Sequence, residues 1–368
     1  MLKNPRSAAE GREMTTRASR TRKKRASVLL LVSMALMAAG IGAAMGLDLS
    51  RLYMAKRTAK FRADAAALAA VMELDGTHAG LERAREISGR AALAAHTSGD
   101  PASGLRIEFS TQGGAWLERP SVPQKITKVR VTSTVFVPFA LLRTFVPQPK
   151  SHAWAVAVAE QRPKNEFEEG LFPYAVLAHN ETAPAFGLQA GQLHTLRWPS
   201  REGIDSGQVC AADRDPRVIA RATSNGMSEM GYIEMASTHG IRKSVLNEYQ
   251  SSQRRIGDPL RFTEGIRHME TQALGERIAS DPDASSLTYA EYAARGIGNG
   301  RRIVAAPIHS GAPKFNVLQI GAFFLLPAIE YREGIMEPFC AEYLGPYIQG
   351  GKRKGAGEAG FYVSSLVQ

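Results

Sequence analysis

Cysteine and aromatic residues are scarce in this chain, and long hydrophobic runs are almost absent. Two cysteines among 368 residues exclude a disulfide-rich mini-protein, and their spacing does not match a zinc cluster. Aromatic residues make up 7% and charged residues 22%, while apolar residues reach 44%, which excludes a disordered chain. Only one uncharged stretch is long enough to cross a bilayer, which excludes a protein with several membrane spans.

Glycine, proline and positive charge are plentiful by comparison. The 34 glycines and 19 prolines favour many turns over a helical bundle. The net charge is +11, but residues 1–25 alone hold nine Lys or Arg and two acids. A nucleic-acid-binding domain carries its basic excess on a folded face, whereas here the excess belongs mainly to the N-terminus. We therefore expect no nucleic-acid partner.

The uncharged stretch is residues 26–47, ASVLLLVSMALMAAGIGAAMGL. As a helix it is about 33 Å long, and the hydrocarbon core of a bilayer is about 30 Å thick. A basic cluster lies directly before it and consists of Arg22, Lys23, Lys24 and Arg25. By the positive-inside rule this cluster keeps residues 1–25 in the cytoplasm, and the remainder of the chain is exported. The sequence thus predicts a single transmembrane helix at residues 26–47 in contact with the lipid bilayer.

Three other interpretations of this N-terminus compete with a retained anchor, and one of them, a nuclear signal in the basic run, is disfavoured by the membrane span directly behind it. A cleaved signal peptide has the same order of charge and apolar residues, and residues 42–44 (Gly-Ala-Ala) resemble a cleavage site. The apolar stretch is longer than a usual signal core, which favours a retained anchor. A substrate of prepilin peptidase needs a glycine at the junction and a glutamate soon after it, and neither is present. Cleavage stays open as an alternative and leads to a freely secreted binding protein.

The helix is expected to continue beyond the membrane. Residues 48–74 contain no Gly or Pro and are rich in helix-forming residues, and Gly76 is a natural terminator. A stripe of small residues recurs every four positions at Ala55, Ala59, Ala63, Ala67 and Val71. Such a stripe permits close packing, either on the protein's own exported domain or on a partner. Within the span Gly42 and Gly46 form a GxxxG pattern, which favours helix association in lipid.

A more specific pattern runs through residues 25–70. A basic residue precedes the span, the acid Asp48 stands at its outer end, and Tyr53, Lys56 and Arg57 follow. The block DAAALAA then begins at Asp64. In this order and spacing the segment resembles the N-terminal segment of the TadG-like proteins of Tad (tight adherence, Flp) pilus assembly. It departs from that family at residues 61–62, where Phe-Arg replaces the usual Gln-Asn.

The resemblance implies a bitopic inner-membrane protein of pilus assembly or of a type II-related secretion apparatus. Two later segments, GNGRRIVAAPI and FCAEYLGPYIQG, also resemble the exported region of some long members. The implied partners are other Tad/Flp pilus-assembly proteins, and the resemblance implies neither a cofactor nor an enzymatic activity. We expect helix packing at Gly42, Gly46, Asp48, Tyr53 and Asp64, the glycines from their spacing and the other three from the resemblance.

The exported region is expected to contain two α+β parts. In the first, residues 48–162, a helix over 78–96 begins after Thr77 and buries a face of apolar residues. That face is expected to be Leu81, Ala84, Ile87, Ala91 and Ala94. Alternating strands follow at 105–109, 126–137 and 152–159, with a short helix at 138–145 and a polar linker at 162–169.

The second part, residues 170–368, is expected to be rich in β-structure. Candidate strands are residues 172–177, 193–198, 303–308, 317–326 and 360–367. Candidate helices are residues 265–280 and 289–295, the latter with a capping box at Thr288 and Gly296 at its end. The predicted fold class is α+β: one transmembrane helix that continues into a long helix, followed by an exported region rich in antiparallel sheet.

Motifs that carry chemistry are few. No GxSxG or HExxH occurs, and no two of the eight histidines lie two to four positions apart, so a metal site has no local support. The GxGxxG pattern at 355–360 is followed by a strand-like segment, whereas dinucleotide binding needs a helix there. A non-enzymatic envelope protein is therefore predicted, with no cofactor and no metal. The alternative is a membrane-tethered periplasmic hydrolase or ligand-binding protein with a dispersed site.

The two cysteines, Cys210 and Cys340, are predicted to form a disulfide. They lie 130 positions apart in the same exported region, and free thiols do not persist in an oxidising compartment. The other interpretation is that each is a separate buried cysteine, which behaves as a small apolar residue.

Overall fold

The computed structural model describes most of the chain, and its side chains in all but a few places. The described residues are 7–95, 104–137, 139, 151–168, 170–199, 204–223, 231–233, 238–246, 254–262, 270–311, 314–332, 337–349, 355 and 359–367. The side chains of residues 7–27, 29, 151 and 238–241 lie outside this description. The chain divides into two compact units: Met1–Phe61, Ser98–Gly104 and Ser133–Ala155 in unit 1, and Arg62–Thr97, Leu105–Thr132 and Val156–Gln368 in unit 2.

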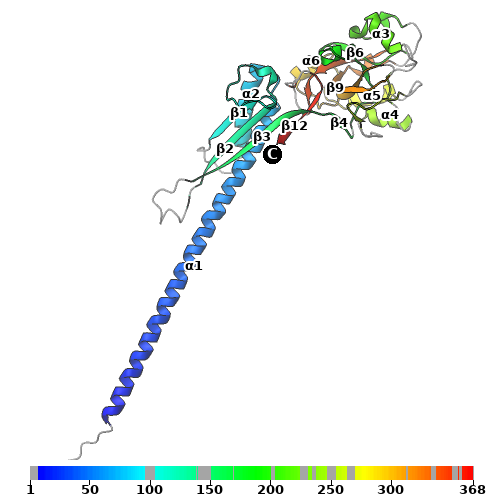
Figure 1. The fold of residues 1–368 in the computed structure, drawn as a ribbon. Helices are drawn as coiled ribbons and strands as arrows, with labels where there is room; N and C mark the ends of the chain where they lie inside the picture. The colour runs from blue at the N-terminus through cyan, green and yellow to red at the C-terminus, as the bar shows by residue number, and fades with distance from the viewer. Residues whose placement is uncertain are drawn as a thin grey trace, which may run out of the picture. The chain divides into compact units, whose positions relative to one another are not determined.

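The first helix, α1 (Ser7–Val71), is continuous over 65 residues (Figure 1). From Leu30 onward it is long and apolar enough to span a membrane. Large apolar side chains in this part, such as Leu36 and Met37, are more than 60% exposed, as lipid-facing side chains are. The helix passes residue 48 without a break, as predicted, but ends at Val71 rather than 74. Gly76, at φ +76°, then reverses the chain.

The small-residue stripe of α1 docks on the adjoining sheet of the same chain, so packing on the protein's own domain, the first of the two alternatives, is confirmed. Ala63, Ala67 and Val71 are fully buried and share a core with Phe109 and Val129 of the adjoining sheet. Small side chains allow the strands to approach the helix closely. Within unit 1, Lys56 donates from Nζ to the carbonyl of Trp154 and lies 4.7 Å from the centroid of its ring.

The second helix, α2 (His78–Ala94), begins as predicted, because the Thr77 side chain accepts a hydrogen bond from the Gly80 amide. Its buried face differs from the prediction. The buried positions are Gly80, Leu81, Ala84, Ser88 and Ala92, whereas Ile87 and Ala91 are half-buried and Ala94 is exposed. The helix therefore packs through the small residues Ala84, Ser88 and Ala92, and such small side chains let its axis lie close to the sheet.

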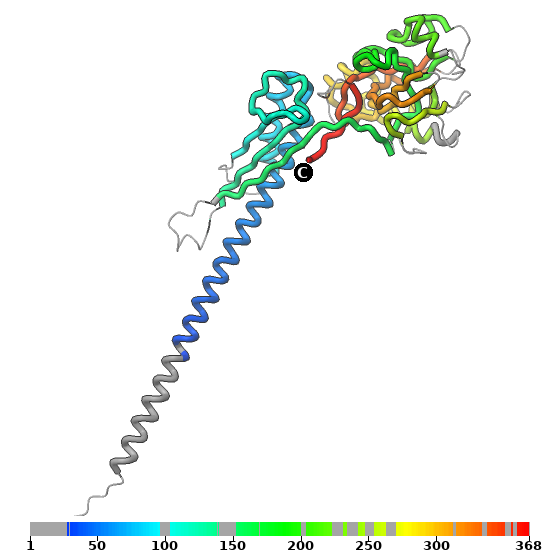
Figure 2. Tube along the Cα trace, viewed as in Figure 1, coloured from blue at the N-terminus to red at the C-terminus, as the bar shows by residue number. Residues whose placement is uncertain are grey.

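The first sheet has the order β1-β2-β3-β12-β11. Its strands are β1 (Leu105–Ser110), β2 (Lys128–Val137), β3 (Ser151–Pro163), β12 (Phe361–Val367) and β11 (Tyr347–Ile348). The last strand, β12, pairs antiparallel with β3, with Leu366 opposite Ala159 (Figure 2). The expected linker at 162–169 is wrong in part, since β3 extends through Pro163 to pair with β12 and β4 (Glu166–Phe167) follows it. The helix expected at 138–145 lies outside the described residues, except for residue 139, which is not helical.

The second sheet has the order β5-β8-β9-β10-β6. Its strands are β5 (Val176–Leu177), β8 (Ile303–His309), β9 (Val317–Leu325), β10 (Phe339–Gly345) and β6 (Leu193–Arg197). Three of the predicted strands, β6, β8 and β9, appear within one residue of their expected ends. The strand expected at 172–177 is reduced to β5, because Leu171 and Tyr174 make only isolated bridges. A separate pair joins β4 to β7 (Arg254–Arg255).

Short helices and 3-10 turns lie in the connections between strands. They are α3 (Pro216–Thr223), α4 (Thr238–Val245), α5 (Glu270–Ala279) and α6 (Tyr289–Arg295), with 3-10 turns at Pro123–Lys125, Pro184–Gly187, Ser206–Gln208, Ala211–Asp213 and Ala328–Glu330. The structure begins α5 at Glu270, and residues 265–269 of the predicted helix lie outside the described part. The α6 caps agree with the prediction, except that the Glu291 carboxylate accepts from the Leu287 amide instead of that of Thr288. The fold class is α+β, as predicted.

Candidate functional site

The structure joins Cys210 to Cys340, the pairing predicted from the sequence, with 5.7 Å between their Cα atoms. Cys340 lies on β10 opposite Thr195 of β6, and the Cys210 amide donates to Thr195 Oγ1 at 3.2 Å. The bridge therefore holds the turn Ala211–Asp213 against two strands of the second sheet.

That turn places Asp213 between two histidines that the sequence analysis left unassigned. His179 Nε2 lies 2.6 Å and His194 Nδ1 lies 3.1 Å from Asp213 Oδ1, and the Thr195 amide donates to Oδ2. Burial raises the pKa of Asp213, but hydrogen bonds from His179, His194 and Thr195 outweigh it and hold the pKa well below its usual range. Asp213 is thus a buried, ionised carboxylate.

The three side chains have the donor types and spacing of a metal site, since their nearest ligand atoms all lie within 4.8 Å of one another. The hydrogen bonds argue against that assignment. His194 Nε2 accepts from the Gln189 amide at 3.4 Å, which leaves the ring proton on Nδ1, where it points at Asp213. A metal at Nδ1 requires that nitrogen to be unprotonated. The cluster is better explained as a carboxylate held by its donors.

Sequence spacing did not reveal this cluster because its members are far apart along the chain. Asp213 is 34 positions from His179 and 19 from His194. The pairing of β6 with β10 and the disulfide bring them together. The only signal in the sequence was the pair of cysteines, since one of them immediately precedes the turn that carries Asp213.

The predicted helix-packing residues divide between two environments. Asp48 is 1% exposed although Leu47 and Leu49 beside it are more than half exposed, so it lies on the covered side of α1. Asp64 is half-buried beside the docked stripe, whereas Tyr53 is exposed and has Arg57 over its ring at 5.9 Å.

No described atom approaches the two glycines predicted to mediate helix association. A Cβ added at Gly42 or Gly46 meets nothing within 4 Å, so helix association at these glycines stays a prediction. The cluster Arg22, Lys23, Lys24 and Arg25 lies on the helical backbone of α1, and its side chains are outside the described part.

Arg62 of α1 lies in an unusual environment. The residue is 3% exposed, and its Nε and Nη1 have no hydrogen-bond partner in the part of the chain that the structure describes. Burial lowers the pKa of the guanidinium. Such a cation is costly to bury without a partner.

A cleft of about 800 Å³ opens in unit 2 beside β8 and α6. Aromatic rings and basic side chains dominate its walls: Phe167, Tyr289, Tyr292, Tyr347 and Phe361, with Lys164, Arg277 and Arg301. The glycine-rich segment 296–300 forms one edge. Among the described residues that line this cleft, none is an Asp or Glu.

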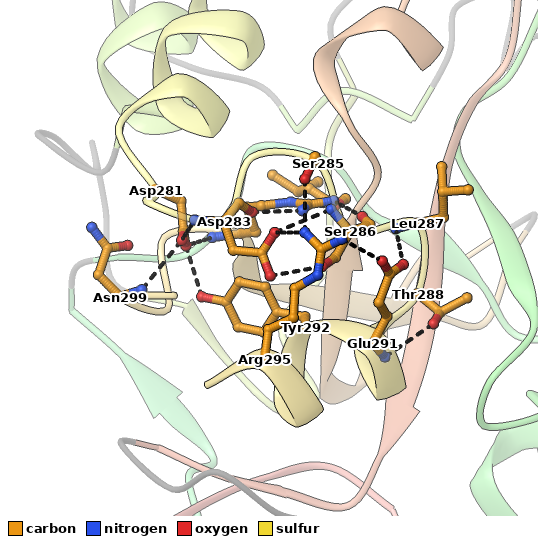
Figure 3. Close-up of polar contacts among 12 residues, drawn as sticks. Asp281, Asp283, Ser285, Ser286, Leu287, Thr288, Glu291, Tyr292, Arg295 and Asn299 are labelled. Atoms are coloured by element: carbon orange, nitrogen blue, oxygen red, sulfur yellow. Dashed lines mark hydrogen bonds and ion pairs between the residues drawn. The ribbon is translucent and has the colours of Figure 1, made fainter. Parts of the chain in front are cut away.

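A hydrogen-bond network fixes the edge formed by the glycine-rich segment (Figure 3). Asp281 accepts from the Tyr292 hydroxyl at 2.7 Å and from the amide of Asn299 at 3.2 Å, while the Gly300 amide donates to the Tyr292 oxygen at 2.7 Å. Burial and the bond to Asp281 raise the pKa of Tyr292, so its hydroxyl stays a donor. A Cβ at Gly298 would lie only 2.1 Å from the Tyr292 ring, so glycine is required there.

A second set of contacts supports the same edge from behind. Asp283 accepts from the Ser286 hydroxyl at 2.6 Å and from Arg295 Nη1 at 3.2 Å (Figure 3). Arg302, fully buried, donates to the carbonyls of Asp283, Ser286 and Leu325. These bonds are internal to the scaffold, and they leave Tyr292 and the glycine-rich segment in one defined position.

Comparison with known proteins adds no assignment. No protein-family model, no curated protein and no solved structure matches this chain.

Proposed function

We propose that this protein is a non-enzymatic envelope component of Tad/Flp pilus assembly or a related secretion machinery. It is anchored in the bacterial inner membrane and contacts partner assembly proteins in the periplasm. The supporting observation is α1 itself. Its apolar part exposes its side chains, and the same helix continues into the docked stripe that carries the TadG-like order of Asp48, Tyr53, Lys56 and Asp64.

Two further features support the orientation with the N-terminus in the cytoplasm. The basic cluster before the span is a topology determinant under the positive-inside rule. The disulfide between Cys210 and Cys340 favours an oxidising compartment for unit 2. The lipid bilayer and other Tad/Flp assembly proteins are the proposed partners.

Topology is tested with reporters and membrane extraction. A periplasm-active reporter fused after Gly76 should be active, a cytoplasm-active reporter at the same site inactive, and the protein should resist carbonate extraction. A soluble mature form that begins near Met45 would instead establish the signal-peptide alternative and a secreted protein.

The assembly role is tested in the producing bacterium. Crosslinking of the full-length protein in envelopes, followed by affinity purification, should recover Tad/Flp assembly proteins, and deletion of the gene should abolish surface pili. Normal pili after deletion would contradict the role in pilus assembly, whatever the topology.

A second candidate function is a membrane-tethered ligand-binding protein of the periplasm. The aromatic and basic cleft in unit 2 favours it, because concave sites with a few placed polar groups are the usual form of a ligand site.

A further inference from the structure

The most informative side chain in the cleft is Arg277, a buried cation in a wall without carboxylates. It is 6% exposed. Its Nε donates to the Arg301 carbonyl at 2.7 Å and its Nη1 to the Val245 carbonyl at 2.7 Å. These neutral acceptors fix the plane of the guanidinium but leave its charge without a counter-ion. Within the described chain, Nη2 has no hydrogen-bond partner, so it is available to a ligand in the cleft that Arg277 lines.

A second cation lies next to it and adds to the imbalance of charge. Arg301 lines the same cleft, and its Nη1 donates to the Leu246 carbonyl at 3.0 Å. Burial first, and then the neighbouring charge of Arg301, lower the pKa of Arg277 to about 10. Two like charges in one partly desolvated wall destabilise each other, and an anion between them removes that penalty.

Aromatic rings form much of the remaining wall, beside the polar side chains of Lys164, Asn299 and Gln349. The Tyr289 and Tyr347 rings meet edge to face at 6.2 Å between centroids, and Tyr347 and Phe361 pack at 5.7 Å. Tyr292 is held by Asp281, as Figure 3 shows, and by the Gly300 amide. A preformed cleft of this kind favours a ligand with a planar or apolar body, because little ordering entropy is lost on binding.

We propose that this cleft binds an anionic group, a carboxylate or phosphate, carried on an apolar or aromatic body, with Arg277 and Arg301 as its counter-charges. The body packs against the tyrosine and phenylalanine rings, and the anion accepts hydrogen bonds from the two guanidiniums. The inference goes beyond the proposed pilus-assembly role and depends neither on the membrane topology nor on any assembly partner.

The test uses the full-length protein in detergent micelles and a pair of probes that differ only in charge. N-acetyl-phenylalanine carries a carboxylate on an aromatic body, and N-acetyl-phenylalanine amide is its neutral counterpart. Titration calorimetry should detect the acid and show at least tenfold weaker binding of the amide, the loss expected for one charge-assisted hydrogen bond. Inorganic phosphate and phenyl phosphate form a second arm, which distinguishes a phosphate ligand from a carboxylate ligand.

Variants assign the binding to the cleft. Arg301→Gln should weaken binding of the preferred anionic probe about tenfold, and Arg277→Gln at least as much. Arg217→Gln, at an exposed position on α3 and away from the cleft lining, removes the same charge and should leave binding unchanged. Because Arg277 is buried, the thermal unfolding of each variant is measured as well, and Arg301→Gln alone suffices if Arg277→Gln does not fold.

Three results would overturn the proposal. They are equal binding of the charged and neutral probes, an equal loss of binding in Arg217→Gln and Arg301→Gln, and no binding of any of the four probes at millimolar concentration. Each of them is compatible with pilus assembly and with membrane anchoring, so this proposal and the proposed function fail separately.

Discussion

At the scale of single residues, Arg62 is the side chain that the surrounding structure supports least. Its guanidinium is buried, and two of its nitrogens have no partner in the described chain. Arg62→Leu removes an uncompensated buried cation and keeps an apolar side chain against the core. We expect the free energy of unfolding to rise by about 1–3 kcal/mol. Thermal or urea unfolding in detergent, followed by tryptophan fluorescence, measures the change.

The matched control for this prediction is Arg57→Leu. Arg57 stands on the exposed side of the same helix and interacts with the Tyr53 ring, so its loss should change stability by no more than about 0.5 kcal/mol. A lower midpoint for Arg62→Leu than for the unmodified protein would show that the buried guanidinium is stabilising.

Asp213 is the opposite of Arg62, because its buried charge has hydrogen-bond partners in His179, His194 and the Thr195 amide. Its folded-state pKa is depressed, so its contribution to stability is fully present above the unfolded pKa of about 4 and is lost as pH falls below that value. Asp213→Asn cannot accept all three hydrogen bonds and should cost about 2–4 kcal/mol at pH 7. The difference from the unmodified protein should shrink as the pH of the unfolding experiment is lowered toward 2.

The exposed Glu168 provides the control for this titration. Glu168→Gln should change the free energy of unfolding at pH 7 by no more than about 0.5 kcal/mol. A constant difference between Asp213→Asn and the unmodified protein down to pH 2 would mean that the carboxylate is not held ionised by its donors.

These residues show where sequence reasoning stops. The disulfide was predictable, because the chain has only two cysteines and the sequence predicts that both lie in an oxidising compartment. The Asp213 cluster and the Arg277 cleft were not predictable. Each unites residues from separate strands and helices, so its members form no short motif in the sequence. The burial of Arg62 was likewise hidden, since a basic residue on a long helix is normally solvated.

At the scale of secondary-structure elements, α1 was predictable and the second sheet only in part. An uncharged run followed by helix formers indicates one helix, and strands such as β8 and β9 are apolar on both faces. β10 was missed because Cys340 and Glu342 interrupt its apolar pattern. The face of α2 was misassigned only after Ala84, because the prediction left out the polar Ser88, whereas the helix buries every fourth residue from Ala84, namely Ser88 and Ala92.

The membrane part of α1 carries an element-scale prediction. Met37 lies near the middle of the span and is 67% exposed, so Met37→Arg should place a charge in lipid at a cost of about 2.5–3.5 kcal/mol. Membrane integration, measured as the carbonate-resistant fraction, should fall sharply. Met54→Arg is the matched control: it is equally exposed on the same helix, but beyond Asp48, and should integrate normally. Equal integration of both variants would contradict the assignment of residues 26–47 as the transmembrane segment.

At the scale of the whole molecule, the C-terminal strand β12 is built into the interior of the first sheet. β3 comes from the first half of the chain and β12 from its last residues, and the order β3-β12-β11 places the C-terminal strand inside a sheet instead of at its edge. The sequence predicted both strands but not their pairing, because register between segments two hundred residues apart depends on the complete fold.

This position of β12 predicts a strong effect of a small deletion. Truncation after Ala359 removes β12, leaves the β3 amides and carbonyls that face β12 unpaired along Val158 to Pro163, and detaches β11 from its only partner in the described sheet. We expect cooperative unfolding of unit 2 to be lost or shifted to much lower temperature, and β3 to become accessible to protease in membranes. Deletion of residue 368 alone, which lies beyond the strand, should have no effect. Both truncated proteins should still integrate into the membrane, since α1 is unchanged. If the protein lacking β12 unfolds at the same temperature as the full chain, β12 is dispensable for the folding of unit 2.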